Sequence, residues 1–523
     1  MGHKAFDIGG PEGQSTANAF RGGSGGMRTV KESVMVIEVQ RRSDGKLFID
    51  GAYTDGAGGR TSPVYEKATG KEIGRFAVAD RSDLDRAVAA AKRAQPGWAE
   101  TGYDVRAGLL RKVARLVEER TDEIADVIVR ETGSIRGKAL YEIGASINEL
   151  YEAAALTSRA TGEIIPSHNT GKLSIAQRIP VGVVAVITPW NFPFILGFRA
   201  VAPAIALGNT VVLKPASFTP ICGGQLIAEL FEAAGAPVGV INLLTGSGDS
   251  VGEPLAAHPD VNMIHLTGST EVGMKMGEIA GRGLKKVSLE LGGNNALVIL
   301  DDADIENASM IGAWSSWHYQ GQTCITASRQ IVMRAIADRY LEALARRARA
   351  IVVGDPSMEG IGLGPMISDG QLQHAHKLVE ASLAQGAKLV EGGTYEGVFY
   401  RPTVLTDVTP EMPVYLEEVF GPVAPITIVD TEEEALALVN DSPYGLVNAV
   451  LTADMARGLA FAEKVHSGMV HVNDATPLDE AHVPFGGLGM SGMGGRSGGD
   501  ANLEEFTERR WISIQRTPVH YPY

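Results

Sequence analysis

The sequence predicts an α/β protein with a doubly wound, Rossmann-like sheet and a second α/β domain. From residue 181 onward, strand-like and helix-like segments alternate, which is the pattern of βαβ units. The chain has 523 residues, which is long enough for two or three domains with large cores. Its hydrophobic fraction of 44% and charged fraction of 21% are those of a globular protein, so wholesale disorder is excluded.

Charge and cysteine content exclude several functional classes. There are 62 Asp and Glu against 47 Lys and Arg, a net charge of −15, so neither nucleic acid nor an anionic membrane is expected as a partner. The apolar run at 181–213 is interrupted by prolines and by Arg199, and we do not expect it to cross a membrane. The two cysteines cannot build a disulfide framework, which favours a reducing, cytoplasmic setting. No C-x-x-C or H-E-x-x-H motif occurs, so no metal site is expected.

The first third of the chain predicts a tail, short strands, helices and a hairpin. Residues 1–34 are rich in Gly and Ser and lack an apolar secretory core, which predicts a disordered tail. Residues 36–80 read as short strands and turns. Ser82 is expected to open a helix, with Asp85 completing an approximate capping box, and helices continue to residue 157. Residues 158–180 alternate around an Asn-Thr-Gly turn, which predicts a hairpin arm.

The doubly wound region begins with a β-branched run at 181–188, typical of a buried parallel strand. Thr219 followed by Pro220 predicts the start of a helix that ends at Gly235. Another helix is expected from Thr270, and a later one carries Trp314 and Trp317. Alternation continues to about residue 470, which predicts the second α/β domain. Further strands are expected at 210–214, 240–244, 262–266, 284–291 and 295–300.

Two residues are candidates for covalent chemistry and its general base. Cys324 follows a helical stretch, and a cysteine thiolate is a strong nucleophile near neutral pH. A buried, unreactive cysteine is the ordinary alternative, and Cys222 in an apolar helix fits that description. Glu290 ends an apolar strand beside two glycines, where burial would raise its pKa toward that of a base. A glutamate that faces solvent at the strand end is the other interpretation.

Two glycine-containing segments resemble phosphate-binding loops. Residues 246–252 (GSGDSVG) depart from the dinucleotide fingerprint by one residue. Residues 267–273 (TGSTEVG) fit better because they follow a strand and open a helix, whose free N–H groups attract phosphate. Lys214 at a strand end suits a ribose or a phosphate, and a solvated surface lysine is the alternative.

Taken together, the ordered motifs resemble those of the aldehyde dehydrogenase superfamily, closest to the benzaldehyde (aromatic aldehyde) branch. The match spans residues 36–515 and implies the aldehyde dehydrogenase fold. The branch is indicated by residues 191–199 (NFPFILGFR), the Trp-rich approach to Cys324 and the glycine-rich stretch from residue 486. The family motifs are TPWNFP (188–193), LKPA (213–216), LTGSTEVG (266–273), LELGGN (289–294), GQTC (321–324), EEVFGP (417–422) and PFGG (484–487).

The resemblance implies NAD(P)-dependent oxidation of an aldehyde to a carboxylic acid. Cys324 would attack the aldehyde carbon, and the Asn191 amide with the Cys324 backbone N–H would stabilise the oxyanion. Glu290 would activate the water that hydrolyses the thioester. A CoA-acylating enzyme and a catalytically silent binding protein are the alternatives, but Cys324, Asn191 and Glu290 are all present.

The resemblance also implies the ligand-binding residues. NAD is the expected cofactor, and NADP is admissible because Ser217 stands where NAD-dependent members carry a glutamate. A benzaldehyde-like substrate is expected, with a semialdehyde as the alternative if Arg199 binds a carboxylate; a structural Arg199 is the preferred interpretation. Cofactor contacts are expected from Thr188, Trp190, Lys214, Ser217, Gly268, Ser269, Gly273, Leu291, Glu418 and Phe420, and substrate contacts from Phe192, Leu196, Arg199, His318, Thr323 and Ile325.

The domain organisation follows from the same resemblance. Residues 35–157 and 181–292 are expected to form the NAD(P)-binding domain and residues 293–489 the catalytic domain. The hairpin at 158–180 and the segment 490–523 resemble oligomerisation elements, so a homodimer or tetramer is expected.

Overall fold

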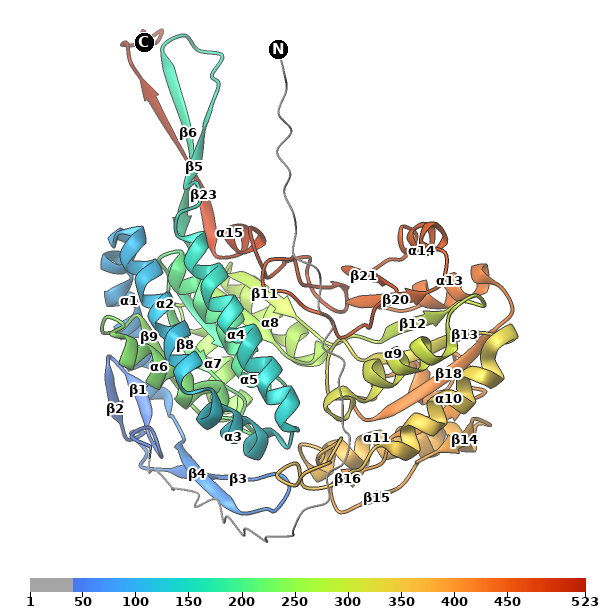
Figure 1. The fold of residues 1–523 in the computed structure, drawn as a ribbon. Helices are drawn as coiled ribbons and strands as arrows, with labels where there is room; N and C mark the ends of the chain where they lie inside the picture. Colours follow the sequence, from blue (N-terminus) through green and yellow to red (C-terminus); the bar gives the residue numbers. More distant parts are fainter. Residues whose placement is uncertain (1–40) are drawn as a thin grey trace, which may run out of the picture. The chain divides into compact units, whose positions relative to one another are not determined.

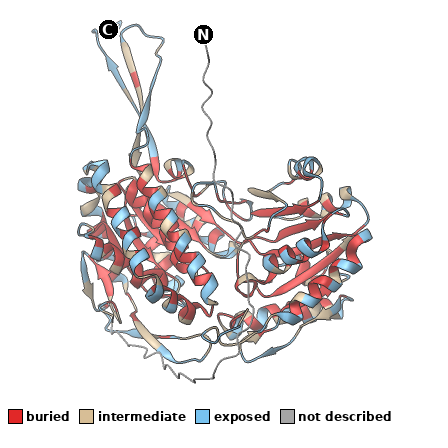
Figure 2. Cartoon of the chain, in the orientation of Figure 1, coloured by how far each residue is buried: buried red, intermediate tan, exposed pale blue. Residues whose placement is uncertain are grey.

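A computed structural model describes residues 41–523 of the chain (Figure 1). The tail predicted for residues 1–34 and the start of the strand region at residues 36–40 lie outside the described residues. Two seven-stranded sheets organise the described part, and helices flank both of them. Figure 2 shows that both sheets are buried along most of their length.

The first sheet has the strand order β11-β10-β7-β8-β9-β1-β2. Its first five strands are parallel, and the short hairpin β1–β2 closes one edge in antiparallel pairing. The predicted strands from residue 181 onward are confirmed within a few residues. The bounds are β1 (Leu47–Ile49), β2 (Ala52–Thr54), β7 (Val183–Ile187), β8 (Thr210–Lys214), β9 (Ile241–Leu243), β10 (Met263–Thr267) and β11 (Lys286–Glu290).

Helices cover both faces of this sheet, as the doubly wound prediction requires. Val184 and Val186 of β7 pack into one core, whereas Val183, Ala185 and Ile187 pack into the other. This period-2 alternation explains why the strand reads as a continuous apolar run. The helices are α1 (Arg81–Glu100), α2 (Tyr103–Glu119), α3 (Thr121–Thr132), α4 (Arg136–Leu156), α5 (Pro193–Ala206), α6 (Leu226–Ala234), α7 (Glu253–Ala257) and α8 (Thr270–Gly283).

The capping box of α1 and the start of β11 each differ from the prediction by two residues. Helix α1 is capped by Asp80, whose side chain accepts the Asp83 N–H at 3.1 Å while the Asp83 carboxylate accepts the Asp80 N–H at 3.0 Å. The capping box therefore lies two residues before the predicted Ser82–Asp85 pair. The strand predicted from Leu284 begins at Lys286, because Leu284 ends α8 in the left-handed conformation.

The helix predicted after Thr219 starts differently as well. Its first turn is a π-helix, η1 (Ile221–Gln225), and α6 follows and ends at Gly235 as predicted. The buried Thr219 hydroxyl has no hydrogen-bond partner, so it caps nothing. Instead the Glu131 carboxylate of α3 accepts the backbone N–H groups of Ile221 at 2.8 Å and Cys222 at 2.6 Å. The cap comes from a distant residue, which local sequence does not reveal.

The second sheet has the order β14-β17-β18-β13-β12-β20-β21 and is parallel except for β14. It confirms the predicted second α/β region, although the predicted domain boundaries stay a prediction. Its strands are β12 (Asn295–Ile299), β13 (Ala327–Met333), β14 (Lys388–Glu391), β17 (Thr403–Thr406), β18 (Val423–Val429), β20 (Val447–Leu451) and β21 (Met469–Val472). Its helices are α9 (Ile305–Trp317), η3 (His318–Gly321), η4 (Arg334–Ile336), α10 (Ala337–Ala350), α11 (Asp369–Ala384), α12 (Pro413–Leu416), α13 (Glu432–Asn440) and α14 (Met455–Ala462).

The predicted hairpin arm is confirmed and gains a third strand. Strands β5 (Gly162–Ile165) and β6 (Lys172–Pro180) form the hairpin, and β23 (Thr507–Gln515) pairs antiparallel with β6 along its whole length (Figure 1). The short helix α15 (Ala501–Glu505) leads into β23. Three small two-stranded sheets complete the elements: β3 (Thr61–Tyr65) with β4 (Glu72–Ala77), β15 (Tyr395–Glu396) with β16 (Phe399–Tyr400), and β19 (Tyr444–Gly445) with β22 (Leu488–Gly489).

The glycine-rich segment at 486–499 is an ordered set of turns that joins the two sheets. The Leu291 N–H donates to the Ser491 carbonyl at 3.0 Å, and Phe485 and Ser497 exchange two backbone hydrogen bonds. A methyl group on Gly486 would lie 2.6 Å from the Gly495 carbonyl oxygen. This close approach explains the need for glycine there. Within residues 41–523, no helix combines the length and the apolar character needed to cross a membrane.

Candidate active site

Cys324 lies in the short segment between η3 and β13. Its side chain is partly exposed and packs with Ile325, Val447 and Phe485. The preceding residues Tyr319 and Gln320 have positive φ angles of 49° and 55°.

A left-handed backbone is unusual for such side chains and persists only where the surroundings hold it. Both side chains are anchored: the Tyr319 hydroxyl donates to the Thr132 carbonyl at 3.1 Å, and the Gln320 amide donates to the Pro365 carbonyl at 2.6 Å. Hydrogen bonds to the carbonyls of Thr132 and Pro365 therefore hold the turn that precedes Cys324.

The electrostatic surroundings keep the Cys324 sulfur protonated in the protein alone. Burial raises the pKa of the Cys324 thiol to about 12, and the nearby Glu418 and Glu290 carboxylates add to this shift. The Arg199 guanidinium opposes it. A bound group with positive charge would be needed to favour the thiolate.

Asn191 lies in the loop between β7 and α5 and is buried. Its side-chain amide nitrogen donates to the Gln322 carbonyl at 3.1 Å, two residues before Cys324. Its side-chain oxygen has no hydrogen-bond partner. The sequence places Asn191 and Cys324 133 positions apart, and the fold brings their loops into contact.

Glu290 ends strand β11 and is 4% exposed, so the solvent-facing interpretation is wrong. One of its carboxylate oxygens, Oε2, has no hydrogen-bond partner. Burial raises the pKa of the Glu290 carboxyl well above its ordinary value, with Arg199 opposing the shift. A methyl group on Gly486 would lie 3.0 Å from the Glu290 carboxylate. An unpaired, buried carboxylate of this kind has the properties of a general base.

A buried pair that the sequence did not reveal, Lys138 and Glu142, lies on α4. The Lys138 ammonium lies 2.5 Å from the Glu142 carboxylate and donates to the Asn191 carbonyl at 2.8 Å. The other Glu142 oxygen accepts the Phe194 N–H at 2.7 Å and so caps α5. The ammonium also lies 4.2 Å from the centre of the Phe192 ring. Spacing at i,i+4 was the available signal, but the same spacing is common in solvated surface pairs.

Lys214 and Ser217 lie at the carboxyl end of β8, where ligands bind in open α/β sheets. The Lys214 side chain is buried, which lowers its pKa to about 8, and no hydrogen bond or ion pair to its ammonium occurs among residues 41–523. Thr188, at the end of β7, has a buried hydroxyl without a partner. Ser217 is exposed and donates to the Gly246 carbonyl at 2.8 Å. These groups leave polar atoms available for a ligand.

The 267–273 segment has the expected strand-to-helix geometry. Ser269 is the N-cap of α8, and its hydroxyl accepts the Val272 N–H at 3.4 Å. Gly268 connects β10 to this cap. A methyl group on Gly273 would lie 2.4 Å from the Leu291 side chain, so glycine allows α8 to pack closely against the end of β11.

Glu418, Phe420 and Trp190 form a further group among the expected cofactor contacts. The Glu418 carboxylate accepts the Gly293 N–H at 3.2 Å, and burial raises its pKa to about 8. A methyl group on Gly292 would lie 2.2 Å from this carboxylate, so a larger residue there would displace the Glu418 side chain. The Phe420 ring contacts the Trp190 ring edge-on, with 5.4 Å between their centres.

The residues expected around the substrate fall into two groups. Phe192 and Leu196 pack with Tyr319 in one apolar cluster, and Ile325 packs with Cys324 in another. His318 stacks on Trp314 at 4.2 Å between ring centres, and burial lowers its pKa to about 3, so its ring is neutral. The Thr323 hydroxyl is buried without a partner.

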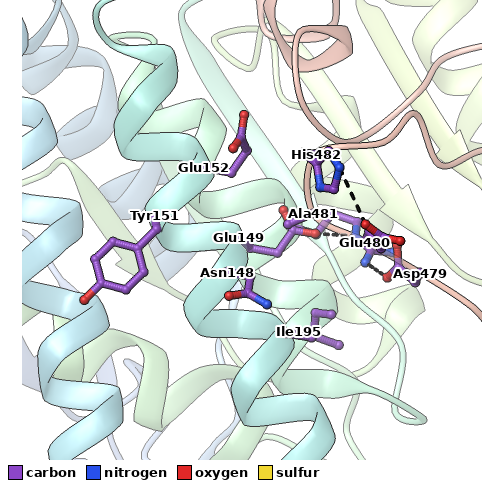
Figure 3. Close-up of a pocket in the computed structure, with 11 residues that line it drawn as sticks. Asn148, Glu149, Tyr151, Glu152, Ile195, Asp479, Glu480, Ala481 and His482 are labelled. Carbon is purple, nitrogen blue, oxygen red and sulfur yellow. Dashed lines mark hydrogen bonds and ion pairs between the residues drawn. The ribbon is translucent and has the colours of Figure 1, made fainter. Parts of the chain in front are cut away.

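Arg199 is the sixth expected substrate residue, and it is paired with carboxylates, as the structural interpretation held. Its guanidinium lies 3.0 Å from Glu149 and also forms an ion pair with Asp479. The sequence did not indicate that Glu149 and Asp479 would be the partners of Arg199. Arg199 lines a pocket of about 450 Å³ between α4, α5 and the loop at 479–482 (Figure 3). In the described part of the chain, no group of three or more His, Cys, Asp or Glu residues is placed to hold a metal ion.

Comparisons with known proteins show which family the chain resembles. The model of the aldehyde dehydrogenase family matches residues 53–512. A benzaldehyde dehydrogenase (NAD+) of Pseudomonas putida is 48% identical over 92% of this chain and 98% of its own length. A vanillin dehydrogenase of an Amycolatopsis strain is 47% identical over 92% of this chain and 98% of its own length. Betaine aldehyde dehydrogenase of Staphylococcus aureus in complex with NAD+ superposes with a TM-score of 0.90 at 31% identity, covering 92% of this chain and 97% of that one.

Proposed function

The chain belongs to the aldehyde dehydrogenase family, and we propose that it oxidises aromatic aldehydes to carboxylic acids with NAD and with Cys324 as nucleophile. One observation carries the proposal. The thiol of Cys324, the amide of Asn191 and the unpaired carboxylate of Glu290 belong to one buried site, although they are spread over residues 191–324. The expected family, fold and enzyme class are confirmed by the comparisons.

The three residues divide the reaction between them. The Cys324 thiolate adds to the aldehyde carbon, and the oxyanion that forms is stabilised by the Asn191 amide and the Cys324 backbone N–H. Bound NAD supplies the acceptor for the hydride that leaves the same carbon, which turns the adduct into a thioester. Glu290 removes a proton from water, which attacks the thioester and releases the acid and the thiol.

The chain's own residues fit such a cofactor. Lys214 has a buried ammonium that pairs with no group of residues 41–523, and the N-terminus of α8 offers free N–H groups to a phosphate. Glu418 lies against Gly292 and Gly293, with its carboxylate available to ribose hydroxyls. Ser217 brings no negative charge to this end of β8, so we expect NADP to be accepted more weakly than NAD rather than excluded.

The substrate assignment rests on the relatives and on Arg199. The relatives reported above are named for benzaldehyde and vanillin, both aromatic aldehydes. Phe192, Leu196 and Ile325 provide apolar walls, which suit a flat ring. A semialdehyde would need a free cation for its carboxylate, and the Arg199 charge is already compensated by Glu149 and Asp479. Glu290 favours release to water over transfer to CoA.

Self-association and a cytoplasmic location belong to the same proposal. The arm formed by β5, β6 and β23 carries exposed apolar side chains: Ile164 is 74% and Trp511 68% exposed. A second copy of the chain would cover them. Cys222 and Cys324 are both free thiols, in keeping with a reducing compartment.

The first experiment follows absorbance of the reduced cofactor with benzaldehyde and either NAD or NADP. Wild type and Cys222→Ala are expected to turn over, and Cys324→Ala is expected to be inactive. Glu290→Gln is expected to give one equivalent of reduced cofactor per active site and then stop, because hydride transfer precedes hydrolysis. Full activity in Cys324→Ala, or steady turnover in Glu290→Gln, would contradict the assigned roles.

A further inference from the structure

The pocket beside Arg199 borders the Cys324 site. Its inner wall includes Ile195 and Arg199 of α5, the helix that follows the Asn191 loop directly (Figure 3). Ile195 belongs to the same apolar cluster as Phe192. The Arg199 guanidinium carbon lies 4.7 Å from the centre of the Phe485 ring, and Phe485 packs against Cys324. Phe485 thus links the Cys324 site to the pocket, and the charges of Arg199 and Asp479 in the pocket lining both influence the pKa of Cys324.

The pocket carries an excess of negative charge. Arg199 is buried, and its guanidinium is held by the carboxylates of Glu149 and Asp479. Glu152 and Glu480 also line the pocket, so four carboxylates face one guanidinium. His482 is the remaining titratable base of the lining and lies 3.5 Å from Glu480. Burial raises the pKa of Glu149 to about 7, so this carboxyl is partly protonated near neutral pH. Ionised carboxylates accept hydrogen bonds, so a ligand that donates a hydrogen bond complements them.

We propose that this pocket receives the ring substituent of the substrate and selects by charge, accepting neutral donors such as a phenolic hydroxyl and rejecting carboxylates. This inference rests on the proposed function and deepens it. A carboxylate substituent would add a further anion to a lining that already holds four carboxylates and one guanidinium, and would meet repulsion in a partly desolvated site. A hydroxyl in the same place donates to Asp479 or Glu149 and leaves the ion pairs intact. Asp479 and Glu149 are thus specificity-determining residues.

Four substrates of similar shape test the selection in the full-length enzyme. These are benzaldehyde, 4-hydroxybenzaldehyde, 4-formylbenzamide and 4-carboxybenzaldehyde. The amide matches the carboxylate in shape and carries no charge. For wild type we expect kcat/KM with 4-carboxybenzaldehyde to be about 100-fold lower than with 4-formylbenzamide. The ratio should shrink as ionic strength rises, because Glu152 and Glu480 are partly exposed.

Asp479→Asn removes one carboxylate while keeping the side chain's shape. We expect kcat/KM for 4-carboxybenzaldehyde to rise about tenfold relative to benzaldehyde, while 4-hydroxybenzaldehyde loses its advantage. Asp338→Asn is the matched control, because it makes the same change on the exposed face of α10 and should alter neither ratio. Thermal denaturation establishes that Asp479→Asn is folded. Should it not fold, Glu152→Gln at the pocket lining takes its place, with a smaller shift in the same direction.

Equal oxidation of 4-carboxybenzaldehyde and 4-formylbenzamide by wild type would overturn the inference while leaving the proposed function standing. Ratios that do not change in the folded Asp479→Asn and Glu152→Gln variants would overturn it too. If wild type oxidises none of the four aldehydes, the proposed function itself is overturned.

Discussion

At the scale of single residues, the site is defined by what its polar atoms lack. In the described part of the chain, four buried polar atoms of the site have no hydrogen-bond partner: Asn191 Oδ1, Glu290 Oε2 and the hydroxyl oxygens of Thr188 and Thr323. Such groups are costly in a folded protein and are retained where a ligand or a reacting group satisfies them. Their position around Cys324 and at the carboxyl end of β7 coincides with the sites expected for substrate and cofactor.

Asn191→Ala tests the oxyanion donor. We expect kcat with benzaldehyde to fall about 10²–10³-fold, because one preorganised donor is lost. The rate of Cys324 alkylation by iodoacetamide should stay unchanged, since no aldehyde oxyanion forms in that reaction. Asn191→Ala activity within a few-fold of wild type would show that the amide does not act as this donor.

The pH dependence of Cys324 follows from its raised pKa. With a pKa of about 12, the thiolate fraction rises tenfold for each pH unit between pH 7 and pH 9. Alkylation of the protein without cofactor should therefore accelerate about tenfold per unit and show no plateau in this range. Cys324→Ala is the control, because Cys222 is fully buried with its own pKa well above the ordinary value. A plateau near pH 8 would contradict the assigned surroundings.

At the scale of elements, α4 ties the Asn191 loop to the Cys324 turn. Lys138 donates to the Asn191 carbonyl, and its ammonium lies 4.4 Å from the centre of the Tyr319 ring in that turn. Glu142 caps α5 through the Phe194 N–H. One buried ion pair thus contacts both chain segments that carry the reaction, which lie in different parts of the sequence.

Lys138→Met and the double variant Lys138→Met/Glu142→Gln separate stability from positioning. The single variant leaves the Glu142 carboxylate buried and unpaired and should lose about 3–5 kcal/mol of unfolding free energy. The double variant removes that charge, keeps an oxygen to cap α5, and should recover most of the stability. The kcat of both variants should lie below that of wild type, because the Asn191 carbonyl has lost its hydrogen-bond donor. Urea denaturation and steady-state kinetics measure the two quantities, and parallel recovery of both would show a purely structural role.

At the scale of the whole molecule, the arm carries several exposed apolar side chains. Strands β5, β6 and β23 form a three-stranded sheet on which Ile164, Ile165, Trp511 and Ile514 are exposed. Monomeric proteins seldom leave such a ribbon uncovered. The self-association proposed above would therefore involve the C-terminal strand, which lies far from the catalytic residues in sequence.

Trp511→Asp is expected to weaken association between copies. A charge on this strand would be buried and unpaired in the interface, so sedimentation velocity should show a shift toward the monomer at micromolar concentration. Glu508→Gln, an exposed change on the same strand, should leave the sedimentation coefficient unchanged. If the Trp511→Asp protein sediments like wild type, the arm is not part of an interface between copies.

The sequence by itself determined the alternation of strands and helices, the hairpin arm and the identity of Cys324, Glu290 and Asn191 as candidates. The elements follow from local periodicity, Cys324 and Glu290 from residue types whose chemistry is specific, and Asn191 from the resemblance to the aldehyde dehydrogenase motifs. Tertiary structure alone decided the cap of α6 by Glu131, the buried Lys138–Glu142 pair and the carboxylates that hold Arg199. Each joins residues through space, and a charged side chain that will be buried reads in sequence like one that faces water. Burial, which depends on the whole fold, sets both the partners and the pKa of these groups.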